Sequence, residues 1–266
     1  MLKKVPLQEG PYELQINKLF STEPVCSDSR NHCVHLLDVI ELPNDPPILV
    51  QPLLRPFYKP PLQTFGEFVT FFAQICEVGF VVLDATNRIS ESRREYNSCT
   101  KITSLIGWFI SILAFYFESN VTYGRDCTSE NIMLDPSNMY PESFHPVKMS
   151  RSRDFRHRAK AYTRTQRPSR YLLIDFGLSR YYDPANGPPL DGPLRGGDKS
   201  APEHQDDETL CNPFPTDVYY LGNLVRGYFM QVRDSFCDRE SILIFHGSEI
   251  SRVRVYGTTR RRDGSR

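Results

Sequence analysis

The chain has 266 residues, of which 39% are hydrophobic and 24% charged, proportions that are ordinary for a globular protein. Its 32 basic and 32 acidic residues cancel, so the net charge favours no class of partner. The seven cysteines are odd in number and have no C-x-x-C spacing. This argues against a zinc site or a disulfide framework and favours a reducing compartment, the cytoplasm or the nucleus.

The first part of the chain predicts a helix, then strands, then a second helix. Residues 11–20 place apolar side chains near helical spacing. Residues 31–42 and 46–57 are apolar runs bounded by Pro and Asn, which is typical of short strands. Residues 64–77, TFGEFVTFFAQICE, have an amphipathic helical pattern that begins at a threonine. No steady period persists over residues 78–101, where we expect a surface insertion or linker.

Residues 102–117 carry no charge and could be taken for a membrane segment. They number sixteen, fewer than the roughly 20 residues that a helix needs to cross a bilayer. We therefore expect a buried helix, with membrane anchoring as the alternative. The N-terminal stretch MLKKVPLQEGPYELQ lacks the apolar run of a secretory signal.

The second half combines a basic stretch, a strand and a helix. Residues 145–170 are basic with only Asp154 in opposition, which predicts a solvated, exposed flap. A docking surface for an acidic partner is the alternative. Residues 171–180, YLLIDFGLSR, indicate an apolar strand that ends in Asp-Phe-Gly, and residues 215–231 predict a helix. The basic tail from residue 232 loses this order, and we expect it to be irregular.

Three polar residues point to phosphoryl transfer. Asp126 precedes Asn131 by five positions, and an apolar run follows; Asp175 comes at the end of a later apolar strand. A carboxylate can accept the proton of an attacking hydroxyl, and carboxylate and amide oxygens are ligands that suit Mg²⁺. Each pattern alone occurs by chance. Their order, followed by Ala-Pro-Glu and Asp-Val-Tyr-Tyr-Leu-Gly, matches the protein-kinase signature set.

The chain thus resembles the eukaryotic-type protein kinases, in particular a kinase-like group common in fungal genomes. The resemblance rests on blocks such as GRDCTSENIMLD, YTRTQRPSRYLLIDFGLSRYYDP, RGGDKSAPE and PFPTDVYYLGN. It implies an α+β, two-lobe fold with ATP and Mg²⁺ as cofactors and a protein Ser/Thr substrate, and neither nucleic acid nor membrane as a partner. The implied parts are a partial N-lobe (1–54), a mainly helical C-lobe (55–231) with insertions at about 78–112 and 140–170, and an irregular basic tail (232–266).

The resemblance also implies roles for residues of the catalytic and metal loops. Asp126 would be the catalytic base, and Arg125 would steady the activation segment. Asn131 and Asp175 would hold Mg²⁺. Asp217 would brace the catalytic loop from the following helix.

The ATP side of the site is implied by the N-terminal residues. Lys3 would be the ATP-binding lysine, with Glu13 as its partner on a helix; a solvated terminal lysine is the alternative. Pro52 and Leu54 fall where the chain would meet adenine. Pro52 has no N–H but still offers its carbonyl, the group that this position needs.

Several positions depart from the family pattern. Gly124 stands where the family has a histidine, no G-x-G-x-x-G loop precedes Lys3, and the late C-lobe helices are not recognisable after residue 231. Glu203, which would end the activation segment, then lacks a recognisable partner. We expect weak ATP binding and slow or absent phosphorylation, so a pseudokinase-type scaffold is the alternative. A small-molecule phosphotransferase of the aminoglycoside type shares the loops but not the Ala-Pro-Glu or Asp-Val-Tyr-Tyr-Leu-Gly blocks.

The two segments without periodicity share one feature. Each begins at a valine, Val78 and Val232, and an in-frame intron donor GT would be read as valine. We hypothesise that both segments are retained or mispredicted intron sequence.

Overall fold

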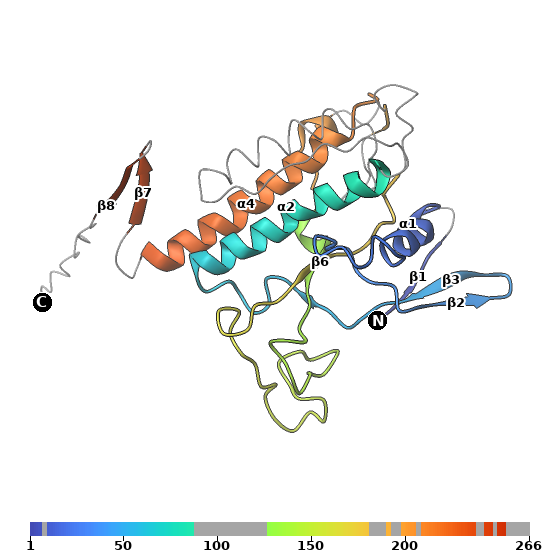
Figure 1. The fold of residues 1–266 in the computed structure, drawn as a ribbon, viewed down its shortest axis with the longest axis horizontal. Coiled ribbons are helices and arrows are strands. Elements are labelled where there is room, and N and C mark those ends of the chain that lie inside the picture. The colour runs from blue at the N-terminus through green and yellow to red at the C-terminus, as the bar shows by residue number, and fades with distance from the viewer. Residues whose placement is uncertain are drawn as a thin grey trace, which may run out of the picture. The chain divides into compact units, whose positions relative to one another are not determined.

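The computed structural model describes residues 1–6, 10–87, 127–180, 190–192, 198–205, 209–237, 242–246 and 249–253. These residues form an α+β fold of helices and small antiparallel sheets (Figure 1). The chain divides into two compact units, Met1–Val225 and Arg226–Arg266. All described candidate residues belong to the first unit.

The first sheet contains β1 (Leu2–Lys4), β2 (Asp38–Leu42) and β3 (Asp45–Val50), in the order β1-β3-β2. Both neighbours of β3 are antiparallel to it, with Lys3 opposite Leu49 in the register. Asn44, between β2 and β3, has φ 63°, a left-handed conformation that asparagine tolerates in tight turns. The strands are shorter than predicted, because residues 31–37 and 51–54 are not part of a strand apart from an isolated bridge at Cys33.

Helix α1 (Glu13–Phe20) follows β1 and confirms the helix expected at the start of the chain. It begins two residues later than the pattern suggested, because Pro11 and Tyr12 form the preceding turn. Its buried side chains recur at helical spacing and are Glu13, Ile16, Asn17 and Phe20. One face of α1 is therefore buried, and two of its four positions are polar.

The second sheet joins β4 (Arg55–Pro56), β5 (Ile132–Leu134) and β6 (Tyr171–Leu173), in that order and antiparallel. Ile132 pairs with Leu173 and Leu134 with Tyr171. The segments that precede β5 and follow β6 therefore meet at one end of this pair of strands. Strand β6 ends two residues before Asp175, so the Asp-Phe-Gly segment is a turn.

Helix α2 (Phe65–Asn87) confirms the helix predicted over residues 64–77 but continues ten residues further. Regular structure was expected to stop at Val78, and this expectation is wrong for residues 78–87, which continue the helix. The remainder of the expected insertion lies outside the described residues. Once a helix is formed, each added residue gains a hydrogen bond, so weak side-chain periodicity does not end it. Phe71 packs on Tyr171 of β6, with ring centroids 4.9 Å apart, which places α2 against the second sheet.

Helix α4 (Phe214–Cys237) confirms the helix predicted over residues 215–231 and passes beyond it. Strands β7 (Ile242–His246) and β8 (Glu249–Val253) pair as an antiparallel hairpin in the second unit. The tail is therefore not irregular over these stretches, which corrects the expectation. The sequence signal for this hairpin is two apolar-containing runs separated by a glycine, SILIF and EISRVRV, and it was missed.

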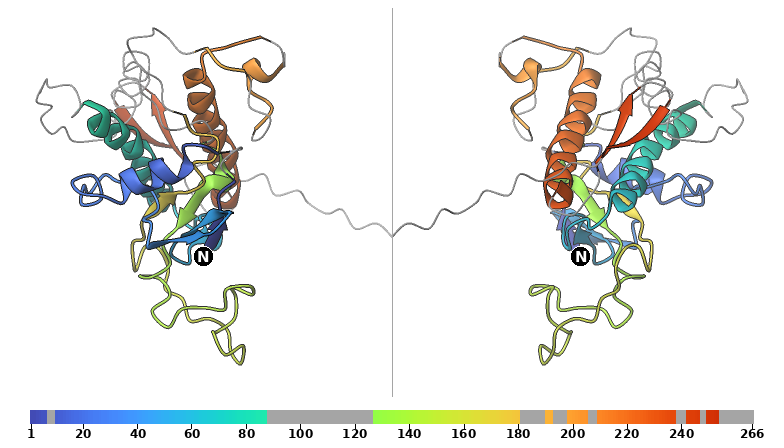
Figure 2. Two further views of the ribbon diagram at one scale, coloured as in Figure 1. Left: turned by 90° about the vertical axis from the view of Figure 1, so that its right-hand side faces the viewer. Right: turned by 90° about the vertical axis from the view of Figure 1, so that its left-hand side faces the viewer.

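A long loop without helix or strand, residues 135–170, connects β5 to β6 and extends away from the second sheet (Figure 2). Most of its basic side chains are exposed, as their charge predicted. Arg164 is the exception: it is buried, with its guanidinium directed at backbone carbonyls. Arg55 reaches the loop from β4, donates to the carbonyl of Met149 at 2.8 Å and lies over the Tyr140 ring at 4.4 Å.

Candidate functional site

The centre of the candidate site is the ammonium group of Lys3. Its Nζ donates to Glu13 Oε1 at 2.5 Å and to Asp175 Oδ1 at 2.6 Å. These side chains come from β1, from the first turn of α1 and from the turn after β6. One cation thus joins the carboxylates of two residues, Glu13 and Asp175, that lie far apart in the chain.

Glu13 is the buried member of the group, with 3% of its side chain exposed against 47% for Asp175. Burial raises the pKa of Glu13 above its ordinary value, while the hydrogen bond and charge of Lys3 act to lower it. The backbone carbonyl of Glu13 accepts from Asn17 Nδ2, and the Asn17 amide oxygen accepts from Gln51 Nε2 at 3.2 Å. This buried network ties the start of α1 to the segment after β3.

Asp175 owes its position to an unusual backbone conformation. Its φ is 61°, in the left-handed region that few residues other than glycine adopt. The turn is closed by the Gly177 N–H, which donates to Asp175 Oδ1 at 3.2 Å. The carboxylate therefore accepts from both the turn and Lys3 through one oxygen.

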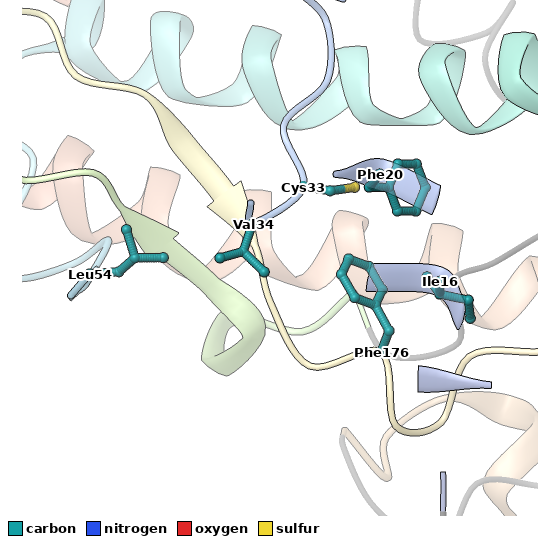
Figure 3. Close-up of a cluster of buried hydrophobic side chains, with 6 residues drawn as sticks. All are labelled: Ile16, Phe20, Cys33, Val34, Leu54 and Phe176. Atoms are coloured by element: carbon teal, nitrogen blue, oxygen red, sulfur yellow. The ribbon is translucent and has the colours of Figure 1, made fainter. Parts of the chain in front are cut away.

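Phe176 holds the same turn against α1. Its ring lies 5.7 Å from that of Phe20, and both belong to a buried apolar cluster (Figure 3). The cluster consists of Ile16, Phe20, Cys33, Val34, Leu54 and Phe176. Because α1 contributes both cluster residues and Glu13, apolar packing and the ion pairs fix the same two elements relative to each other.

Asn131 lies beside the Asp175 turn through its backbone. It ends the 3₁₀ helix Ser129–Asn131, and its carbonyl accepts from the Ile174 N–H at 2.9 Å. On the other side, the Cys127 N–H donates to Asp217 Oδ1 at 3.5 Å, and Asp217 is buried in the first turn of α4. The segment that follows Asp126 is thus connected both to the Asp175 turn and to α4.

The remaining predicted residues fall in three places. Asp126, Arg125 and Gly124 lie outside the described residues. Leu54 is buried in the apolar cluster, and Pro52 is half-buried in the segment between β3 and β4. The site therefore groups Lys3, Glu13 and Asp175 by side-chain contact and places Asn131 next to them along the backbone.

Glu203, the residue expected to end the activation segment, lies in the 3₁₀ helix Pro202–Gln205. Within the described part of the chain, its Oε2 is buried and has no hydrogen-bond partner.

The donor chemistry of the site suits a polyanion bound with a hard cation. Lys3 supplies positive charge, and Asp175 offers a half-exposed carboxylate beside the Asn131 segment. Oxygen ligands of this kind fit Mg²⁺, which accepts one or two side chains and keeps its other positions for phosphates and water. Among the described residues, no three His, Cys, Asp or Glu side chains form a group that could hold a metal ion by themselves.

Sequence reasoning missed several residues that shape the site. Asn17 and Gln51 were not singled out, although a polar residue on the buried face of a helix, four positions after Glu13, is a usable signal. Gly10 and Gly177 also contribute: an added Cβ on either would lie 3.4 Å from Glu13 Oε2. The direct Lys3–Asp175 contact has no local signal, because it joins residues that are 172 positions apart in the chain.

Within the described residues, no helix has both the length and the apolar character that a membrane crossing requires. Residues 102–117, for which membrane anchoring was an alternative, lie outside them. Comparison of the chain with protein-family models, with curated proteins and with solved structures gives no match.

Proposed function

We propose that this chain is a protein-kinase-like protein with a two-lobe fold, which binds ATP with Mg²⁺ and transfers a phosphoryl group slowly to Ser or Thr of a protein substrate. One observation carries the proposal: Lys3 Nζ contacts both Glu13 and Asp175, at 2.5 and 2.6 Å. Phosphoryl transfer depends on positioning and on charge, and a lysine oriented by a glutamate next to a metal-binding aspartate is the arrangement that kinases use.

The described residues support distinct parts of such a site. Lys3 would contact the phosphates, and Glu13 orients it from the buried side. Asn131 and Asp175 would hold Mg²⁺, which when bound neutralises charge on the phosphates. Asp126 remains the proposed base from its place in the sequence, five residues before Asn131.

The Lys3–Asp175 contact leads to an expectation about Mg²⁺. A phosphate that reaches Lys3 comes close to the Asp175 carboxylate, since both lie on the same ammonium group. The single positive charge of Lys3 already faces the Glu13 and Asp175 carboxylates, so Asp175 repels an added phosphate unless a second cation lies between them. ATP binding should therefore depend on Mg²⁺, and the dependence should reside in Asp175.

A second candidate function is a binding module that holds ATP or a protein partner without transfer. It is favoured by Gly124, which stands where the kinase family has a histidine under the metal loop. Loss of one preorganised group of an active site typically costs about 10²–10³ in rate. The kinase proposal requires both ATP binding and phosphoryl transfer, whereas the second candidate requires binding alone.

The test is nucleotide binding by the full chain, measured calorimetrically with ATP alone and with ATP and Mg²⁺. We expect tighter binding with Mg²⁺ and loss of the Mg²⁺ effect in Asp175→Ala. Asp38→Ala is the control and should bind as wild type does, because the Asp38 carboxylate lies on β2 and accepts from the neighbouring Val39 N–H. Transfer is then assayed with labelled ATP and a generic Ser/Thr substrate.

The outcomes separate the readings. Slow transfer that vanishes in Asp175→Ala supports the kinase proposal. Mg²⁺-dependent binding without transfer supports the binding module. Equal ATP affinity in wild type and Asp175→Ala, with and without Mg²⁺, would overturn the proposed Mg²⁺ role of Asp175 and with it the kinase proposal.

A further inference from the structure

Gly10 lies in the loop that leads the chain from Lys3 on β1 to Glu13 on α1. It is buried, and an ideal Cβ built on it would lie 3.2 Å from both the Cα and the carbonyl oxygen of Gly177. Such separations are shorter than nine in ten Cβ contacts in proteins. The nearest atoms belong to backbone, which cannot swing aside as the end of a long side chain can.

The backbone conformation of Gly10 does not explain the glycine, because its φ lies outside the left-handed region. At such a position an alanine is normally tolerated and stabilises the fold by restricting the unfolded chain. What crowds a side chain at Gly10 is the close approach of the Gly177 turn.

The same contact is crowded from the other side. A Cβ on Gly177 would lie 3.1 Å from Asp175 Oδ1 and 3.4 Å from Glu13 Oε2. A Cβ added to Gly10 would lie 3.4 Å from that same Glu13 oxygen. Two glycines therefore leave the space in which two carboxylates approach one ammonium group.

We propose that Gly10 is a positioning residue of the candidate site: its missing side chain allows the backbone at residue 10, just before α1, to lie against Gly177, which keeps Glu13 and Asp175 together on Lys3. A methyl group at residue 10 requires the loop and the turn to separate by a few tenths of an ångström. Because Glu13 belongs to one side of this contact and Asp175 to the other, Lys3 cannot keep both hydrogen bonds at their present lengths.

The first test needs no nucleotide. The full chain is treated with limiting acetic anhydride, and acetylation of Lys3 relative to Lys4 is measured by mass spectrometry. Both lysines lie on β1, but Lys4 is 55% exposed and pairs with Asp45 instead. We expect Gly10→Ala to raise the Lys3-to-Lys4 ratio severalfold. General loosening of β1 would raise both lysines together and leave the ratio unchanged, which would overturn the proposal.

Gly66→Ala is the matched control. Gly66 lies in α2, where an added Cβ would meet only Thr64 Oγ1 at 3.8 Å, an ordinary contact. We expect this variant to keep the wild-type ratio. A double-mutant cycle with Gly177→Ala adds a second criterion: the two substitutions open the same contact, so their effects on the ratio should be less than additive. Additive effects would contradict a shared contact.

The second test rests on the proposed function. Gly10→Ala should lower the affinity for ATP and Mg²⁺ severalfold, because small displacements of positioned groups are costly, whereas Gly66→Ala should not. If wild type binds no ATP while Gly10→Ala changes the lysine ratio, the proposed function fails and the positioning role stands. If wild type binds ATP and Gly10→Ala alters neither readout, the positioning role fails and the proposed function stands.

Discussion

At the scale of single residues, the buried carboxylate of Glu13, paired with Lys3, makes the stability of the site depend on pH. Burial raises the pKa of Glu13 above its ordinary 4.5, and Lys3 only partly offsets this effect. The folded protein therefore binds the Glu13 proton more tightly than the unfolded chain does. By linkage, the contribution of Glu13 to stability is largest below pH 4.5 and declines as the pH rises through the folded-state pKa.

Glu13→Gln should remove this decline, because glutamine keeps the shape of the protonated side chain and does not ionise. We expect the free energy of unfolding of wild type minus that of Glu13→Gln to fall as the pH is raised from below 4.5 toward neutrality. Urea denaturation over a pH series measures the difference. A difference that grows with pH would show that Lys3 outweighs burial.

Two cysteines of the described core give a second residue-scale prediction. Burial raises the pKa of Cys76 to about 12 and raises that of Cys33 as well. Since the thiolate is the reactive form, neither should react with a thiol reagent at neutral pH in the folded protein. Both should be labelled after denaturation, as followed by mass spectrometry. Rapid labelling of Cys33 in native buffer would show that the apolar cluster containing it opens readily.

The residues of the site were predictable to different degrees. Lys3, Glu13 and Asp175 were each proposed from a family pattern, but their common contact depends on the register of β1 and on the left-handed Asp175 backbone. Neither feature can be predicted from local sequence. The alternation of apolar and polar residues specifies which face of a strand is buried, and not which residue of the neighbouring strand lies opposite. Gly10 was not noticed, because a single loop glycine has many ordinary explanations.

At the scale of elements, Arg164 fixes the long loop to the segment before α2. Its guanidinium donates to the carbonyls of Phe57, Pro60 and Pro61, all in a turn without regular structure. These carbonyls would lose their partner in Arg164→Met, and each buried polar group left without one costs about 1–3 kcal/mol. We expect a loss of roughly 2–4 kcal/mol in the free energy of unfolding, measured by chemical denaturation.

Arg158→Met is the control, because Arg158 is an exposed residue of the same loop. Surface substitutions of this kind usually change stability by less than about 0.5 kcal/mol. Equal losses in the two variants would mean that loop charge, rather than the Arg164 hydrogen bonds, is what stabilises the loop.

Helices were easier to locate in the sequence than their ends or the strands. The periodic cores of α1, α2 and α4 were found, while α2 and α4 continue past the points where periodicity fades. Helix continuation depends on backbone hydrogen bonds that any of these residues can make. The strands β4, β5 and β6 have two or three residues each, too few for an alternating pattern to specify.

At the scale of the whole molecule, the α+β class was predictable, and the two-lobe kinase-like arrangement remains a prediction. Composition and motif order indicate which segments belong together, but not how units of the chain are arranged. The hypothesis of retained introns also belongs to this scale. Helix α2 passes through Val78 and α4 through Val232, so helical geometry alone does not mark either point.

Transcript sequencing tests that hypothesis directly. If both segments are intron sequence, reads from mature messenger RNA should join the codon before Val78 to a position near residue 112, and coding sequence should leave the present frame at Val232. Continuous reads through both points would contradict it.

The closure of the loop 135–170 at its base has a practical consequence for protein engineering. Asp135 and Arg170 meet through a 2.9 Å hydrogen bond at the end of β5 and β6, while Ser152 and His157 close a separate exposed turn, also at 2.9 Å. The chain thus enters and leaves that turn at adjacent points, the geometry that accepts an inserted domain most readily. A fluorescent reporter or an affinity tag placed between Ser152 and His157 would leave the hydrogen bonds of Arg164 and the residues around Lys3 in place.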